Sequence, residues 1–163
     1  MTFSTVLDLV SYWFVMFGVY FTVGAVFFLG GYEKLFTGRI AAPPTVAAQF
    51  SGTFLARFLG VNFWWGVLGV VEFLVFLVLL ASIVTGEFLP SRTKSLLQTS
   101  LGLALVLFSF LSFGQNISNN FVGAATQWSY FAGTAILMLL VAQLPPNRPR
   151  RWLTTPFTGD YRT

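Results

Sequence analysis

Long runs of apolar residues, separated by short polar segments, dominate the chain. The four runs cover about residues 10–31, 59–85, 96–114 and 128–144. Each has roughly the 17–25 residues that a helix needs to cross a hydrocarbon core about 30 Å thick. Open strands would leave backbone groups unpaired in lipid, and no short alternating pattern indicates a barrel. The pattern therefore predicts an all-α, integral membrane four-helix bundle, with residues 1–163 forming a single membrane domain.

The polar segments between the runs differ in character. The first is the longest and contains a Pro43-Pro44 break, after which four apolar residues recur at steps of four: Val46, Phe50, Phe54 and Phe58. This spacing predicts a short amphipathic helix that lies in the outer membrane interface; the alternative is a plain loop leading into the second long helix. After the fourth run, a proline stop predicts a basic cytoplasmic tail over residues 145–163.

The basic residues predict the orientation of the chain. With four crossings, the two termini and the second loop share one side of the membrane, which holds six basic residues: Arg92, Lys94, Arg148, Arg150, Arg151 and Arg162. The other side holds Lys34, Arg39 and Arg57. Since cytoplasmic segments carry the excess of Lys and Arg, we expect both termini in the cytoplasm. The short chain and loops favour a bacterial plasma membrane.

Composition limits the chemistry. Hydrophobic residues make up 56% of the chain and charged residues only 9%, with a mean hydropathy of +0.78. Such a chain has too little charge to cover a water-facing surface, so lipid is its main solvent. Cysteine and histidine are both absent, which removes thiol relays, covalent haem attachment and imidazole metal ligands. The net charge of +4 comes from loops and tail, and does not indicate nucleic-acid binding.

Glu72 is the ionisable residue that the pattern places inside the membrane, near the middle of the second long helix. Charged groups at this depth are costly and are functional candidates by default. The carboxyl group can join helices by hydrogen bonds, handle a proton, hold the polar head of a quinone or lipid, or contact a partner subunit. Thirteen residues of helix from Leu59 place Glu72 about 20 Å along the helix. Lys34 should end the first helix near the outer surface, so we expect no direct pair between them.

Small and polar residues on the other long helices are the candidates for contact with Glu72. In the third helix a stripe at helical spacing runs from Gln98 to Asn116, and such stripes face protein rather than lipid. The simplest arrangement buries a polar cluster around the carboxyl group. Its members are Tyr20, Thr22, Ser109, Ser112, Tyr130 and Thr134.

One pattern resembles a known family. The segment 27–36, FFLGGYEKLF, is similar to the end of the first helix of DoxX-like proteins, where a Gly and then Lys-Leu commonly close the helix. A second helix with Gly66, Gly69 and Glu72 follows the outer loop, as in that family. An Arg often found near the start of the first helix has no counterpart here, so the resemblance is to a divergent member. It implies a four-helix membrane protein beside a quinone-linked redox partner, with Lys34 and Glu72 as the positions that contact quinone or lipid.

Three functions remain open from the sequence. The first is an accessory transmembrane subunit of a respiratory or photosynthetic, quinone-linked complex, with other membrane subunits and lipids as partners and no redox centre of its own. The second is the membrane subunit of a quinone-reactive oxidoreductase such as the thiosulfate:quinone type. The third is a small transporter. Catalysis by the chain alone is not expected, because it offers no metal-ligand set and no covalently bound cofactor.

Overall fold

The computed structural model describes residues 3–37 and 41–146, and the side chains from residue 7 onward within them. All of its elements are helices: α1 (Phe3–Phe36), α2 (Pro44–Phe50), α3 (Phe54–Arg57), α4 (Val61–Val84), α5 (Ser95–Ile117) and α6 (Phe121–Gln143). Four of them, α1, α4, α5 and α6, are long and apolar enough to cross a membrane. The prediction of an all-α fold with four helices long and apolar enough to cross a membrane is confirmed. The predicted tail lies outside the described residues from residue 147 onward.

Two of the long helices extend beyond the apolar runs that predicted them. Helix α1 has 34 residues, which corresponds to about 51 Å and exceeds the hydrocarbon thickness. Helix α6 begins at Phe121 rather than near residue 128, because the Asn120 side chain accepts a hydrogen bond from the backbone N–H of Gly123 (3.0 Å). An Asn at this position satisfies one of the free N–H groups of the first turn. Capping, rather than apolarity, therefore sets this helix start.

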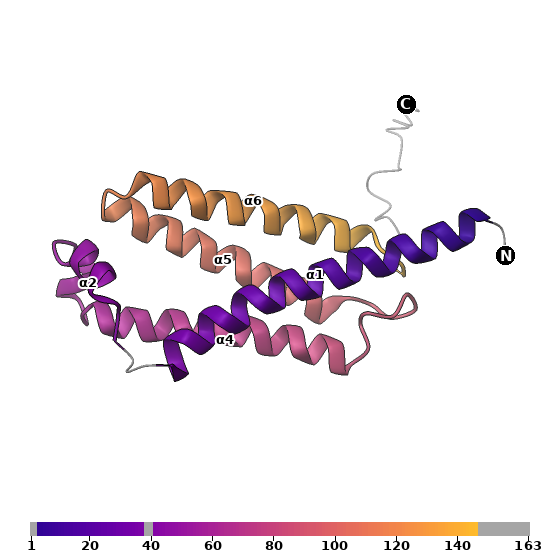
Figure 1. Ribbon diagram of the computed structural model, residues 1–163, viewed down its shortest axis with the longest axis horizontal. Helices are drawn as coiled ribbons and strands as arrows, with labels where there is room; N and C mark the ends of the chain where they lie inside the picture. Colours follow the sequence, from indigo (N-terminus) through magenta and orange to yellow (C-terminus); the bar gives the residue numbers. More distant parts are fainter. Residues whose placement is uncertain (1–2, 38–40, 147–163) are drawn as a thin grey trace, which may run out of the picture.

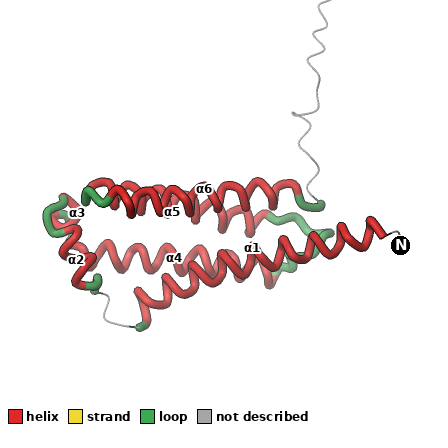
Figure 2. Tube along the Cα trace, turned by 45° about the horizontal axis from the view of Figure 1, so that its top comes forward, coloured by secondary structure: helices red, strands yellow, loops and turns green. Residues whose placement is uncertain are grey.

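The long helices pack in the order in which they occur along the chain. Helix α1 lies on α4, α4 lies on α5, and α5 lies on α6. Figures 1 and 2 show α5 and α6 side by side, with α1 crossing α4 obliquely. Fully covered side chains from α1, α4, α5 and α6 form the core, among them Met16, Val19, Val75, Leu79, Leu97, Leu101 and Val141.

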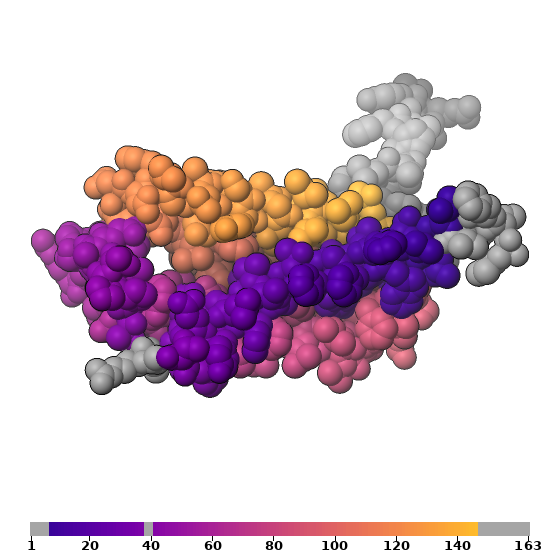
Figure 3. Space-filling model, viewed as in Figure 1, coloured from indigo at the N-terminus to yellow at the C-terminus, as the bar shows by residue number. Residues whose placement is uncertain are grey.

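Helix α6 lies at the edge of this arrangement. Its buried residues are Ala124, Thr134 and Val141, all on the side that packs against α5. In Figure 3, α1 extends across the front of the molecule and leaves α6 uncovered. Most of the α6 surface is therefore available to lipid or to another helix.

The predicted helix of the first outer segment is divided in two. Helix α2 ends at Phe50, and α3 begins at Phe54. Between them the hydroxyl groups of Ser51 and Thr53 donate to the carbonyls of Ala48 (2.8 Å) and Phe50 (2.7 Å). These local bonds compete with continued helix, and Gly52 adds a weak helix former. The single-helix prediction is therefore wrong over residues 51–53.

Helix α2 is fastened to the turn between α5 and α6. The Gln49 side chain donates to Gln115 Oε1 (2.8 Å) and to Ser118 Oγ (2.7 Å). Figure 1 shows α2 at the end of the molecule opposite the start of α1. The two short helices therefore cover one end of the bundle.

Candidate functional site: an ion pair between α1 and α4

Glycines bring α1 and α4 unusually close together near the end of α1. A Cβ atom at Gly31 would lie 2.9 Å from the backbone nitrogen of Phe73, and one at Gly69 would lie 2.8 Å from Lys34 Cβ. A Cβ atom at Gly30 would lie 2.8 Å from Glu72 Oε2. Real side chains do not approach a backbone atom or a Cβ atom so closely, so Gly31 and Gly69 require glycine for this packing, whereas a side chain at Gly30 would displace the end of the Glu72 side chain. Small residues at membrane helix interfaces allow such close approach.

This close approach places Lys34 against Glu72. Lys34 Nζ lies 2.7 Å from Glu72 Oε2, and the two side chains are only 12% and 11% exposed. Lys34 Nζ also donates to the carbonyl of Gly30 (3.2 Å) and lies 4.9 Å from the centre of the Trp65 ring. The ammonium group thus has a carboxylate, a helix carbonyl and an aromatic face around it. Each of these stabilises a positive charge that has left water.

The expectation that Lys34 and Glu72 do not pair is wrong. It assumed that α1 ends at the same depth at which α4 begins. In the structure the last turn of α1 lies beside Gly69, eight residues into α4, or about 12 Å from its start. Figure 1 shows α1 ending partway along α4, with α2 near the start of α4. Lys34 therefore lies at nearly the depth of Glu72.

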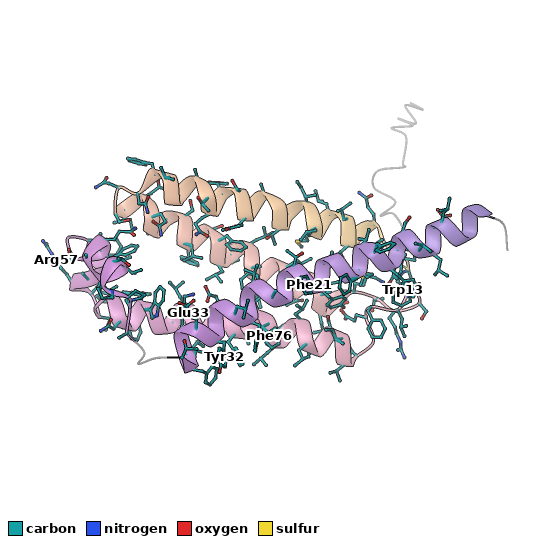
Figure 4. All side chains as sticks on the ribbon, in the orientation of Figure 1. Trp13, Phe21, Tyr32, Glu33, Arg57 and Phe76 are labelled. Atoms are coloured by element: carbon teal, nitrogen blue, oxygen red, sulfur yellow. The ribbon has the colours of Figure 1, made fainter. Side chains whose placement is uncertain are left out.

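The neighbouring side chains of α1 turn away from the pair. Figure 4 shows Tyr32 and Glu33 projecting from different sides of the last turns of α1, with Phe76 on α4 nearby. Tyr32 stacks on Phe28 with ring centres 5.6 Å apart, and Phe28 packs against Phe76 at 5.0 Å. These aromatic side chains form a continuous contact between the outer sides of α1 and α4.

The six predicted polar packing residues do not gather around Glu72. Tyr20 forms a hydrogen bond of 2.9 Å with Ser82. Ser112 and Thr134 are buried, whereas this chain leaves Thr22, Ser109 and Tyr130 uncovered. The hydroxyl groups of Ser109 and Thr134 donate to carbonyls of their own helices (2.9 and 2.8 Å). Because the helix backbone satisfies them, these groups need no contact with Glu72.

The helical stripe on α5 is also rotated from its expected direction. The side of α5 that faces α4 carries Ser100, Ala104 and Leu107, and the Ser100 hydroxyl donates to the carbonyl of Val75 (3.0 Å). The predicted stripe lies toward the edge of α5, so Ser109 and Asn116 reach the surface of this chain.

Two buried charged residues were not singled out from the sequence. The Glu87 carboxylate accepts hydrogen bonds from the backbone N–H groups of Leu96 and Leu97, both at 2.9 Å, and so caps the start of α5. Lys94 is 1% exposed and donates to the carbonyls of Leu89, Arg92 and Pro145. Burial lowers the pKa of Lys94, and the charge of Glu87 opposes that shift.

The Glu87 and Lys94 side chains, with the backbone groups they bind, form a polar clamp that joins the loop before α5 to the residues that follow α6. Tyr12 on α1 extends it by donating to the carbonyl of Phe88 (2.8 Å). The clamp satisfies backbone groups and fixes helix ends, so its role is structural. A charged residue in a short loop carries no local sign of such burial, and only the folded chain brings the carbonyls together.

The arrangement defines the class of protein: a multi-pass helical membrane protein with an ion pair between two of its spanning helices. Within the described residues, no group of three or more His, Cys, Asp or Glu side chains comes together to hold a metal ion. The chemistry available at the pair is hydrogen bonding to a polar head group and proton exchange at Glu72. Comparison of the chain with family models, curated proteins and solved structures finds no match.

Proposed function

We propose that the chain is an accessory transmembrane subunit that packs beside other helices in a membrane energy-conversion complex. The observation that carries this proposal is the uncovered outer face of α6. Ala125, Ser129 and Gly133 follow one another at steps of four, and all three are exposed. A Cβ atom at Gly133 would meet no other atom within 4 Å. Such a face suits close packing with another membrane helix.

The hydroxyl groups on this face support the same conclusion. The Ser129 hydroxyl donates to the carbonyl of Ala125 (3.1 Å), and the Thr126 hydroxyl donates to that of Val122 (3.0 Å). Because these hydroxyl groups donate to carbonyls of their own helix, they need no water as a hydrogen-bond acceptor. The face can therefore pack against another helix without leaving an unpaired donor. The quinone-linked type of complex follows from the resemblance to DoxX-like proteins, and the redox centres belong to the partner subunits.

The proposal includes an orientation in a bacterial plasma membrane, with both termini in the cytoplasm. The start of α1 and the end of α6 lie at the same end of the bundle (Figure 1), as an even number of crossings requires. At the opposite end, Phe54, Phe58 and Leu59 are exposed beside Arg57, which Figure 4 shows at the outer edge. This mixture suits α2 and α3 to the outer interface, where apolar residues dip into the bilayer and a basic side chain meets head groups.

Extraction from the native membrane in a mild detergent tests the accessory role. We expect the chain to migrate with other membrane subunits at fixed stoichiometry, and Gly133→Leu to release it. Gly18→Leu is the matched control, since a Cβ atom at Gly18 on α1 also meets no atom within 4 Å. Migration of the wild-type chain alone would refute the accessory role. Release by both variants would show that the α6 face is not the contact.

A second candidate function rests on the ion pair. A Lys–Glu pair partway along two spanning helices, with each side chain about one-tenth exposed, suits contact with a quinone or lipid head group, or transfer of a proton. Glu72→Gln separates these roles from packing, because the amide still accepts a hydrogen bond but cannot exchange a proton. Unchanged turnover of the host complex with this variant would exclude proton handling by Glu72.

A further inference from the structure

A cavity of about 280 Å³ lies between α5 and α6, away from the Lys34–Glu72 pair. Four aromatic side chains form most of its wall, namely Phe108, Phe113, Trp128 and Phe131. Phe113 and Trp128 are more than half exposed, so the cavity opens toward the outer surface of the bundle. A site of this size lies just below the range of roughly 300–1,000 Å³ found for drug-sized ligands, and suits a single head group.

Two polar atoms at this cavity have no hydrogen-bond partner. Ser112 Oγ and Gln127 Oε1 are both buried and unpaired, and Ser112 as a whole is 5% exposed. Buried polar groups are almost always hydrogen-bonded, because leaving one unpaired is costly. The two atoms belong to side chains on two different helices, and both residues line the same cavity.

The polar residues just beyond the cavity are paired, which makes the two unpaired atoms distinctive. At the turn between α5 and α6, Asn120 Nδ2 donates to Gln115 Oε1 (2.7 Å). The Gln49 side chain donates to Gln115 Oε1 and to Ser118 Oγ. The turn thus satisfies its own amides. Unsatisfied hydrogen-bonding capacity is concentrated at Ser112 and Gln127.

We infer that this cavity binds the uncharged, hydroxyl-bearing head group of a membrane amphiphile. The residues lining it include no charged side chain, so a neutral ligand fits best. A hydroxyl group both donates and accepts, and therefore meets a serine hydroxyl and either end of a glutamine amide. Ser112 turns about one side-chain bond and Gln127 about three, so small rotations present both groups to the cavity.

The aromatic wall further favours a ring that carries the hydroxyl group. Flat rings pack against Phe and Trp side chains in stacked or edge-on contacts that aliphatic head groups do not make. The apolar tail of the amphiphile would leave the cavity between Phe113 and Trp128 and lie along the outside of α5 and α6. A phenolic ring and a glycerol head group share the required hydroxyl chemistry, and experiment can distinguish them.

Fluorine NMR of the full chain labelled with 5-fluorotryptophan in detergent micelles provides the test. Trp128→Phe assigns the Trp128 resonance, while Trp13 and Trp64 report non-specific uptake of the probe. The probes are 4-hexylphenol, its methyl ether 4-hexylanisole, and a monoacylglycerol. We expect 4-hexylphenol to shift the Trp128 signal selectively and saturably. The affinity for 4-hexylanisole should be at least about fivefold lower, as loss of one hydrogen bond predicts.

Variants then test the two polar atoms. Ser112→Ala and Gln127→Met should each lower the affinity for 4-hexylphenol about five- to tenfold. Ser129→Ala, on the outer face of α6, should leave that affinity unchanged. Because Ser112 Oγ has no hydrogen-bond partner within the protein, its removal should leave the melting temperature unchanged or higher. A monoacylglycerol that binds instead, with the same dependence on Ser112 and Gln127, would support the site and assign it to a glycerol head group. Equal binding of the phenol and its ether, or binding insensitive to both variants, would overturn the inference.

Discussion

Replacement of the partners in the Lys34–Glu72 pair offers the sharpest test of the packing described above. Glu72→Leu removes the carboxylate and leaves the Lys34 ammonium group with the Gly30 carbonyl and the Trp65 ring. Removing one partner of a buried pair costs about 3–5 kcal/mol in soluble proteins, because the remaining charge is unpaired. Side-chain hydrogen bonds between membrane helices are weaker, at about 0.6 and up to about 1.7 kcal/mol.

The structure places the expected cost between these limits. Both side chains are about nine-tenths covered, but the two remaining contacts of Lys34 offset part of the loss. We therefore expect Glu72→Leu to lower the free energy of unfolding by about 2–3 kcal/mol. Lys34→Met should cost a similar amount by leaving the carboxylate alone. The double variant should regain most of the stability, because two apolar side chains of similar volume leave no unpaired charge.

Reversible unfolding in mixed micelles of increasing sodium dodecyl sulfate fraction measures these differences, with far-ultraviolet circular dichroism as the signal. The four proteins form a double-mutant cycle with an expected coupling of about 3–5 kcal/mol, since the double variant should lose no more than about 1 kcal/mol. Leu74→Met, on an exposed part of α4, is the control and should change stability by less than about 0.5 kcal/mol. If the two single losses simply add in the double variant, the pair contributes nothing specific and the reasoning fails.

Three further predictions concern the helix contacts and the clamp. Gly31→Ala should cost about 1–3 kcal/mol in the same unfolding assay, because the new methyl group meets the backbone of Phe73; Gly18→Ala, which has open space, should not destabilise, and equal effects would contradict the close approach of α1 to α4. Glu87→Ala should cost about 1–2 kcal/mol by uncapping α5, and faster hydrogen exchange at Leu96 and Leu97 should accompany it; unchanged exchange there would exclude the cap. Burial lowers the pKa of Lys94 below its usual 10.5, so as pH rises toward 10.5 the folded state releases this proton before the unfolded state does. The free energy of unfolding should therefore rise with pH in that alkaline range, and Lys94→Met should lack this contribution; identical pH slopes in the two proteins would refute it.

The sequence by itself determined the class of the protein and the number of its spanning helices. Runs of apolar residues about 20 long have one stable solution in lipid, because a helix satisfies every backbone group within its own segment. Glu72 could be singled out for the same local reason, since a carboxyl group within such a run stands out against its neighbours. These features depend on composition and length alone.

Tertiary structure decided how the helices are offset along the membrane normal and which polar groups meet. No local pattern measures how far α1 reaches along α4, so Lys34 was expected near the surface instead of beside Glu72. The close approach at Gly31 and Gly69 sets that offset, because a side chain at either position would push the two helices apart. Burial of Lys94 and the unpaired atoms at Ser112 and Gln127 depend likewise on groups far apart in the sequence. Local patterns specify what each segment is, whereas packing between segments specifies which side chains face one another.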